Sequence, residues 1–509
     1  SYPVLVKASA GGGGKGMRVV ESPETLVAAV ESAQREAKNA FGDDKVFLEK
    51  WLESVKHVEV QIVGDKHGNI LHCFERECSI QRRHQKIIEE APSPAVDEKL
   101  REALGKSAIE AAKTLNYFST GTVEFLLSEQ EFYFLEVNTR LQVEHPVTEE
   151  ILGIDLVREQ IRIAENKKLS FSQDDLQICG HAIEARVYAE DPQKNFLPSP
   201  GKIQTWAPSS SDNVRFDSGV EEGSFVSPEF DPMIAKVICH APTRTEAAKS
   251  LAKSLRNTKL YGIKNNKEFL ELTLLSKSFL DGDTTTDFIE RVNPNRIREL
   301  SSKNLEEAAI AIAMESQAIN RNSARVLRGI RSGWRNSVMP PQTLKLESKK
   351  TEMGLTYQSQ RDGSFSVSLN AGEPKRVKVF SAGHGEIDIE IDGFRSKYEA
   401  LKIDRTWYLQ NYRGQIEFKE VPKASSEKDE DFSSEIKAPM PGSVIKTFFG
   451  EQDKVSKGDT ILILEAMKME HQILAPRNGT ISRLHARTGD QVSNNQTLVS
   501  FDDEGEKSR

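Results

Sequence analysis

Short runs of alternating hydrophobic and polar residues fill the region from Gln342 to Val421. They recur as FSVSL, KRVKVF, EIDIEIDGF and TWYLQNY, and a period of two predicts antiparallel strands. The preceding segment LEEAAIAIAMES, from Leu305, is predominantly apolar on all sides of a helix, and it predicts one apolar helix. We therefore expect a helix followed by an antiparallel β-barrel over residues 296–422.

The end of the chain contains an internal repeat. APMPGSVIK recurs as APRNGTISR, and at the same offset Asp453 recurs as Asp490. Each half has short β-branched runs between Gly, Pro and Asp, which predicts two similar hairpin units in a small β-sandwich over residues 435–503. The stretch EAMKME lies between the halves, so a turn there presents Lys468 to solvent.

The beginning of the chain predicts a glycine-rich hairpin. GGGGKGMRVV contains the G-x-G-x-x-G spacing of dinucleotide sites, but a strand-like run follows the glycines where such a site needs a helix. The Walker A pattern also fails, because Lys15 is followed by Gly16. A glycine-rich hairpin tip can place its backbone N–H groups against phosphates, and Lys7 on the preceding strand adds a positive charge. The helical run ETLVAAVESAQREAKNAF and the strand-like VFLEKWLE come next.

Another basic segment follows a second expected hairpin. HVEVQIV and the turn residues DKHGN predict that hairpin, and RECSIQRRHQK then predicts a charged loop that brings basic side chains together. A solvated basic loop is the simple interpretation. Anion binding is the functional alternative.

A third hairpin carries candidate metal ligands. GTVEFLL and FYFLEVNTR are strand-like and are separated by the turn-like SEQE. Glu136, Asn138 and Arg140 are two residues apart and share one face of their strand, with Glu124 opposite. Two carboxylates and an amide oxygen suit Mg²⁺, which binds protein oxygens together with phosphate oxygens.

Composition narrows the classes of function. The 509 residues give room for about three or four domains. The net charge of -8 gives no basic excess for nucleic acid, and no apolar run approaches the roughly 18 residues of a membrane span. The four cysteines have no C-x-x-C spacing, which favours a reducing compartment over a disulfide framework.

Two sets of motifs resemble a known family. EAMKME within the duplicated frame resembles the biotinyl domain of biotin-dependent carboxylases, whereas lipoyl domains modify a lysine in D-K-A. YPVLVKASAGGGGKGM, QRRHQK and EVNTRLQVEHPVTE resemble biotin carboxylase, a member of the ATP-grasp class, from residue 1 to about residue 290. The resemblance implies that bicarbonate and ATP form carboxyphosphate, which passes its CO₂ to biotin.

The resemblance implies a role for each matching residue. The residues implied in ATP contact are Lys7, Gly13, Gly14, Glu49, Lys50, Leu52, His57, His84 and Glu124. Those implied as ligands of Mg²⁺ or Mn²⁺ are Glu124, Glu136 and Asn138. Lys86 and Arg140 would bind bicarbonate, Glu144 would be the base that deprotonates it, and Arg186 would stabilise the biotin enolate. Biotin itself would be attached to Lys468.

The implied fold is a multidomain α+β chain. Its expected parts are an ATP-grasp lid (1–52), the C-terminal ATP-grasp subdomain (53–295), a helix-plus-barrel domain that tethers subunits (296–422), a charged linker (423–434) and the biotinyl domain (435–503). Family members begin with a further α/β subdomain that closes the site. That subdomain is absent from this sequence, which begins without an initiator methionine or a signal or transit peptide and therefore looks N-terminally truncated.

The family also implies partners and alternatives. The expected partners are a separate carboxyltransferase β subunit in a hetero-oligomer and a biotin protein ligase. The stretches SAQREAKNAFGDD and RRHQKIIEEAP are most similar to the α subunits of carboxylases that act on 3-methylcrotonyl-CoA. These carboxylases belong to leucine breakdown and are mitochondrial in eukaryotes. In other organisms a cytoplasmic location is expected. The alternatives are a propionyl-CoA carboxylase α subunit, a biotinylated scaffold without catalysis, and a lipoyl-bearing acyltransferase.

Overall fold

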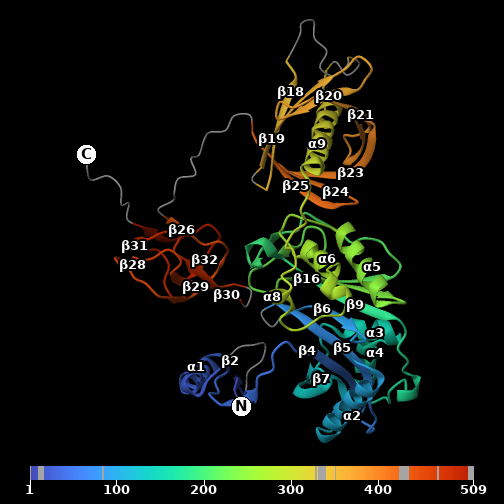
Figure 1. The fold of residues 1–509 in the computed structure, drawn as a ribbon, viewed down its shortest axis with the longest axis vertical. Helices are drawn as coiled ribbons and strands as arrows, with labels where there is room; N and C mark the ends of the chain where they lie inside the picture. Colours follow the sequence, from blue (N-terminus) through green and yellow to red (C-terminus); the bar gives the residue numbers. More distant parts are fainter. Residues whose placement is uncertain are drawn as a thin grey trace.

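The computed structural model describes residues 2–9, 17–82, 85–326, 330, 340–349, 351–422, 435–466 and 469–501. Its elements group into a small N-terminal sheet, a large mixed region, a barrel and a C-terminal sandwich (Figure 1). The expected linker, residues 423–434, lies outside the described residues. No helix of the described chain is long and apolar enough to cross a membrane.

The N-terminal sheet confirms the strands expected on either side of the glycine run. Strand β1 (Val4–Ala8) lies between β2 (Arg18–Val20) and β3 (Val46–Lys50), and both pairings are antiparallel. Helix α1 (Pro23–Phe41) covers this sheet; it begins with a proline and ends at Gly42, whose φ of 76° suits glycine. The tip between β1 and β2, which holds Gly13 and Gly14, is outside the described residues.

An eight-stranded sheet forms the centre of the molecule. Its strands in spatial order are β14 (Val214–Ser218), β16 (Met233–Ala241), β9 (His181–Tyr188), β6 (Gln85–Ala91), β5 (Ile70–Arg82), β4 (Lys56–Gly64), β7 (Ser119–Ser128) and β8 (Glu131–Asn138). Strands β4 and β9 are buried along nearly their whole length. They can be buried on both faces because helices pack against the sheet, and even their charged residues are therefore inside the protein.

The helices around this sheet follow from amphipathic runs with local caps. They are α2 (Glu98–Thr114), α3 (His145–Leu152), α4 (Leu156–Ala164), α5 (Arg244–Asn257), α6 (Lys267–Leu274), α7 (Lys277–Leu280) and α8 (Phe288–Arg291), with 3₁₀ turns at Gln173–Asp175 and Pro192–Lys194. Short two-stranded pairs complete the region: β10 (Glu190–Asp191) with β11 (Leu197–Pro198), β12 (Gly201–Lys202) with β15 (Phe225–Val226), and β13 (Thr205–Ala207) with β17 (Lys259–Tyr261).

The prediction of a charged loop at RECSIQRRHQK is wrong. The segment continues β5 to Arg82, and β6 starts at Gln85, so it is part of a strand pair. Arg76 and Arg82 are buried and bind different carboxylates, Glu59 and Glu190, so they do not form a common anion site.

The barrel encloses the predicted helix. Helix α9 (Ser302–Asn322) and the inward side chains of the strands form one hydrophobic core (Figure 1). The closed strand order is β18 (Gln342–Ser348), β19 (Thr351–Ser359), β20 (Phe365–Leu369), β21 (Lys375–Ser381), β22 (Glu386–Ile391), β23 (Phe394–Ile403), β24 (Thr406–Asn411) and β25 (Gly414–Glu420). Pairing of Leu346 with Glu420 closes the barrel. The barrel contacts the central region where Tyr408 stacks on Tyr261, with ring centroids 4.8 Å apart.

The C-terminal sandwich confirms the internal repeat. One sheet has the order β26 (Glu435–Lys437), β33 (Thr497–Phe501), β31 (Gly479–Leu484) and β28 (Lys454–Val455), and the other β30 (Met469–Leu474), β29 (Thr460–Ala466), β27 (Gly442–Thr447) and β32 (Gln491–Val492). Strands β27, β28 and β29 correspond to β31, β32 and β33 at the offset of the sequence repeat. Strands β29 and β30 pair as a hairpin, with Ala466 opposite Met469. Lys468 lies between them and outside the described residues.

Candidate active site

Carboxylates from three neighbouring strands lie in register on the central sheet. Glu136 on β8 is opposite Glu124 on β7, which is opposite Glu59 on β4. Glu59 is also opposite Arg76 on β5. Glu59 is fully buried and Glu124 is nearly so, while Glu136 is half-exposed. The row therefore leads from solvent into the interior of the protein.

Lys86 is the cation at the centre of this cluster. Its Nζ lies 2.5 Å from Glu59 Oε2, 3.2 Å from Glu124 Oε1 and 2.6 Å from Glu144 Oε1. Burial alone would lower the pKa of Lys86, but Glu59, Cys78, Glu144 and Glu124 raise it well above its ordinary value. Lys86 is therefore positively charged at neutral pH.

Arg76 fixes the inner end of the row. Its side chain has no exposed surface, and its Nε donates to Glu59. Its other nitrogens donate to hydroxyl and amide oxygens on neighbouring elements: Gln61, Thr122, Gln142 and Thr148. A guanidinium with each donor nitrogen hydrogen-bonded stays in one orientation. It also supplies charge that holds Glu59 in place.

Glu144 lies between two cations. It precedes α3, and its carboxylate accepts hydrogen bonds from Lys86 Nζ at 2.6 Å and from Arg186 Nη2 at 2.9 Å. Burial alone would raise the pKa of Glu144, but Lys86, Arg186 and Arg76 together lower it well below its ordinary value. Glu144 is therefore an ionised carboxylate and can accept a proton.

Arg186 has two acidic neighbours on one nitrogen. Its Nη2 contacts Glu144 Oε2 at 2.9 Å and Glu89 Oε1 at 2.5 Å. Its Nε is buried and has no hydrogen-bond partner among the described residues. The two carboxylates on Nη2 hold the guanidinium beside Glu144.

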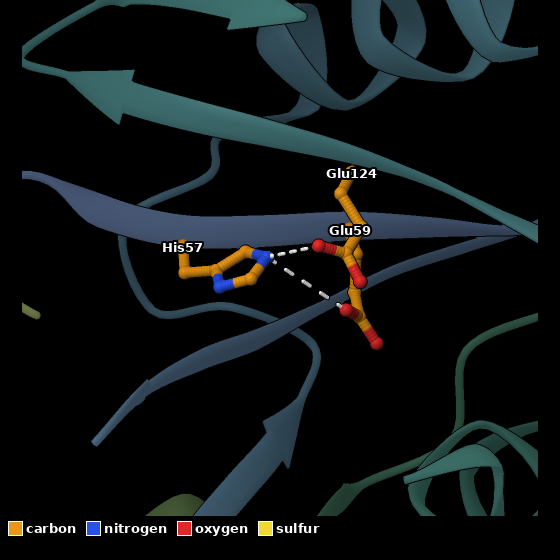
Figure 2. Close-up of side chains that lie close together, drawn as sticks. All are labelled: His57, Glu59 and Glu124. Atoms are coloured by element: carbon orange, nitrogen blue, oxygen red, sulfur yellow. Dashed lines mark hydrogen bonds and ion pairs between the residues drawn. The ribbon is translucent and has the colours of Figure 1, made fainter. Parts of the chain in front are cut away.

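His57 is directed at the carboxylate row. Figure 2 shows its ring facing Glu124 and Glu59, with Nε2 at 2.9 Å from Glu124 Oε2 and 4.0 Å from Glu59 Oε2. Gln81 Nε2 lies 2.8 Å from His57 Nδ1 and donates to it, so the ring proton is on Nε2 and is donated to Glu124. This arrangement fixes the outer oxygen of Glu124.

The predicted metal ligands are close together. Asn138 Nδ2 lies 2.9 Å from Glu124 Oε1 and 3.3 Å from Glu136 Oε1. Burial would raise the pKa of Glu124, but His57, Lys86 and Gln142 lower it strongly, so it is ionised. Two ionisable oxygen donors and one amide oxygen on adjacent strands fit a hard cation such as Mg²⁺. His57, Glu59 and Glu124 also have ligand atoms within 4.8 Å of one another.

The N-terminal sheet adds three predicted residues to the same edge. Lys7 lies 3.8 Å from Glu49 and 3.9 Å from Glu136, and Lys50 lies 3.5 Å from the Tyr133 hydroxyl. Leu52 follows β3 and is half-buried. Lys7 therefore connects the N-terminal sheet with the predicted metal ligands.

Arg140 is at the mouth of the cluster. It is exposed, and its Nη2 lies 3.4 Å from Asn138 Oδ1. The remaining predicted residues, Gly13, Gly14, His84 and Lys468, are outside the described part of the chain.

Three buried carboxylates of this region, Glu59, Glu89 and Glu184, were not predicted. Glu59 and Glu184 each stand between two apolar residues, which is also the pattern of a half-exposed strand, and Glu89 stands in the run IIEEA, which does not alternate. The usable signal was the pairing of acidic positions across strands, because Glu59 is opposite Glu124 and Glu89 is opposite Glu184.

Comparisons with known proteins cover nearly the whole chain. Residues 1–172 match the family described as carbamoyl-phosphate synthase L chain, ATP binding domain, and residues 184–291 match the biotin carboxylase C-terminal domain. Residues 305–423 match the BT domain of the methylcrotonyl-CoA carboxylase alpha-subunit, and residues 434–501 match the family described as biotin-requiring enzyme.

Individual proteins agree with these matches. The mitochondrial methylcrotonoyl-CoA carboxylase subunit alpha of Rattus norvegicus is 39% identical, over 99% of this chain and 72% of its own length. The mitochondrial propionyl-CoA carboxylase alpha chain of Homo sapiens is 38% identical, over 98% and 71%. The biotin carboxylase domain of Hydrogenobacter thermophilus 2-oxoglutarate carboxylase, solved with MgADP, ADP and bicarbonate, is 42% identical with a TM-score of 0.57; the match covers 59% of this chain and 66% of that one.

Proposed function

This chain belongs to the α subunits of the biotin-dependent acyl-CoA carboxylases, and from that premise we propose which of its residues carboxylate biotin. The activity of the family is the ATP-dependent transfer of bicarbonate carbon to biotin. The observation that carries the assignment is Glu144, an ionised carboxylate held between Lys86 and Arg186. This geometry suits a base next to an anion site and a cation that meets biotin.

The proton step falls to Glu144. Bicarbonate, bound by Lys86 from within and by Arg140 at the mouth, gives its proton to a Glu144 oxygen. The lowered pKa of Glu144 keeps that oxygen unprotonated before the step. The resulting anion is then held by Lys86, whose charge is permanent at neutral pH.

The nucleotide side involves the outer residues. ATP would be contacted by the residues that the family resemblance implies for it: Lys7, Gly13, Gly14, Glu49, Lys50, Leu52, His57 and His84. Glu124, Glu136 and Asn138 would hold Mg²⁺ or Mn²⁺, which when bound neutralises charge on the phosphoryl oxygens. Arg186 would stabilise the biotin enolate.

The remaining assignments concern the whole protein. We place the divisions between domains near residues 52, 295 and 422, with biotin on Lys468 of the C-terminal sandwich. The BT-domain match favours 3-methylcrotonyl-CoA as the acyl-CoA, hence a role in leucine breakdown, with propionyl-CoA as the second candidate. A carboxyltransferase subunit would take the carboxyl group, a biotin protein ligase would modify Lys468, and a eukaryotic source would place the protein in the mitochondrial matrix.

Mass spectrometry tests the carrier role. After co-expression with a biotin ligase, the chain is expected to gain the mass of one biotinyl group, and Lys468→Arg is expected to gain none. ATP cleavage that depends on bicarbonate, and its loss in Glu144→Gln, tests the catalytic assignment. Biotinylation without such cleavage would favour the scaffold alternative, and a folded chain that gains no mass would contradict the carrier assignment.

A further inference from the structure

Two buried carboxyl groups lie side by side behind the active site. Glu89 on β6 is directly opposite Glu184 on β9, and neither side chain has exposed surface. Residues opposite one another on antiparallel strands have Cβ atoms about 5 Å apart. The proposed reaction assigns no role to either residue.

Among the described residues, one cation lies within ion-pair distance of this pair. Arg186 Nη2 lies 2.5 Å from Glu89 Oε1, in an ion pair that is not aligned as a hydrogen bond. Neither oxygen of Glu184 has a hydrogen-bond partner among the described residues. Lys236, opposite Arg186 on β16, lowers the pKa of Glu184 through its charge, but its Nζ contacts the carbonyl of Val143 at 3.0 Å and Asp217 at 3.3 Å.

The charged surroundings offset the charge of the pair only in part. The other titratable groups that act on the pair are Lys86 on β6, Lys236 on β16, Cys78 on β5, Tyr188 on β9 and Glu144 before α3. Lys86 is shared among three other carboxylates, and Glu144 adds negative charge. The titratable groups on α3 have other partners, because Arg215 binds Glu149 and His145 Nδ1 lies 2.7 Å from the carbonyl of Gln142.

Two ionised carboxylates repel each other strongly in such a dry environment, and Arg186 contacts Glu89 but makes no ion pair with Glu184 among the described residues. The pKa values follow the geometry. Burial raises the pKa of Glu89 to about 7, and burial together with Glu89 raises the pKa of Glu184 well above its ordinary value. At neutral pH the pair therefore has one proton that an exposed pair would lack.

We propose that Glu89 and Glu184 hold a single proton between them and act as positioning residues for Arg186. The one negative charge of the pair shares Arg186 Nη2 with Glu144, so the guanidinium stays beside Glu144, where it would meet biotin. Loss of the shared proton would add a second negative charge and draw Arg186 away from Glu144. The role toward Arg186 rests on the proposed function, whereas the shared proton does not.

Unfolding at different pH values tests the shared proton in the full chain. A carboxyl whose folded pKa is raised binds more protons in the folded state, so the stability of the wild type falls as pH rises from about 5 through neutral pH. Glu184→Gln keeps a neutral side chain and removes this titration. The Tm of the variant relative to wild type is therefore expected to increase steadily across that range.

The neighbouring residue is a matched control. Glu90 on β6 is equally buried, but its pKa is lowered against the effect of burial by His181 and Arg244. Glu90→Gln should therefore show no such rise in relative Tm. Infrared spectra give a second measurement: the band of a protonated carboxyl at neutral pH should be present in the wild type and absent in Glu184→Gln. Parallel Tm curves or an unchanged band would overturn the proposal.

Kinetics test the role toward Arg186. In ATP cleavage stimulated by biotin, Glu89→Gln should raise the KM for biotin about tenfold and leave the KM for ATP unchanged, with partial rescue by Glu89→Asp. Glu184→Gln should keep the neutral-pH rate and lose the decline at alkaline pH. Equal effects on both KM values would reject the positioning role. A wild type without biotin-stimulated cleavage would count against the proposed function instead, and the Tm curves would still decide on the shared proton.

Discussion

Glu90 illustrates, at the scale of single residues, how this sheet keeps a buried carboxylate ionised. Its oxygens accept from Arg244 Nε at 2.6 Å and Nη2 at 2.9 Å, and His181 Nε2 lies 2.8 Å away. These contacts outweigh burial and lower the pKa of Glu90. The fork of Arg244 connects strand β6 with helix α5, so the pair contributes to packing rather than to chemistry.

Replacing Glu90 by Gln tests this contribution. The variant leaves the half-buried Arg244 without its counter-charge and should lose about 3 kcal/mol of unfolding free energy at pH 7. Because the folded pKa of Glu90 is lowered, the wild-type advantage is present above about pH 4.5 and disappears as pH falls through the folded value. Urea denaturation at pH 7 and at the most acidic pH that preserves the fold would measure both values. An advantage that did not shrink in acid would contradict this account.

The predicted site residues that the structure brings together lie in distinctive motifs. Lys86, Glu144 and Arg186 were expected from their resemblance to the family, and in the structure Glu144 accepts hydrogen bonds from both Lys86 and Arg186. Glu59 and Glu184 were not expected, because a glutamate between two apolar residues is also typical of a strand with one solvent-exposed face. Burial of the second face depends on α3, which the local sequence does not reveal.

At the scale of elements, α2 packs closely on β5 through a glycine. Gly105 is buried in the middle of α2, and a Cβ added there would lie 2.6 Å from His72 Nε2. The imidazole cannot move freely, because it packs edge-on against Phe74 with ring centroids 5.2 Å apart. Helix propensity alone favours alanine at this position by about 1 kcal/mol. Close packing here opposes that preference.

Gly105→Ala is therefore expected to destabilise the protein by about 1–3 kcal/mol. The double variant with His72→Ala should recover part of that loss, because the added methyl group then has space. Thermal unfolding of the two single variants and the double variant gives the coupling energy. A stabilised Gly105→Ala would show that the helix can move away from the sheet at no cost.

Element prediction succeeded where the hydrophobic period was clear. The barrel strands and α9 follow their patterns closely. The β5–β6 segment was mistaken for a loop, because its charged residues hide the strand period. These charged residues can be buried because Arg76 pairs with Glu59 and Arg82 pairs with Glu190, each on a neighbouring element. Such pairings depend on the tertiary structure and cannot be seen in the local sequence.

At the scale of the whole molecule, the barrel is fastened to the central region by a few contacts. Tyr408 stacks on Tyr261 with an interplanar angle of 18°, and Lys264 pairs with Glu417 at 2.7 Å. The ion pair is exposed and contributes little. The aromatic stack is the better candidate for the contact that fixes the two bodies.

Tyr408→Ala should loosen this junction without unfolding either body. The change is expected to weaken the junction by about 1 kcal/mol beyond the lost buried area and to separate the thermal transitions of the barrel and the central region. Lys264→Gln is the control and should leave the transitions as they are. Differential scanning calorimetry would show both, and a single unchanged transition in Tyr408→Ala would assign the coupling to other contacts.

The closed barrel has a consequence for synthesis on the ribosome. Helix α9 is made first, but the strand that completes its enclosure, β25, ends at Glu420 and pairs back to β18. The apolar residues of α9, such as Ile310 and Ile312, cannot be fully buried until β25 has emerged from the ribosome. Pairing between segments so distant in sequence is slow. The nascent chain therefore exposes the apolar surface of α9 from the synthesis of this helix until β25 has paired with β18. Chaperone binding should therefore be strongest while the barrel strands are being translated.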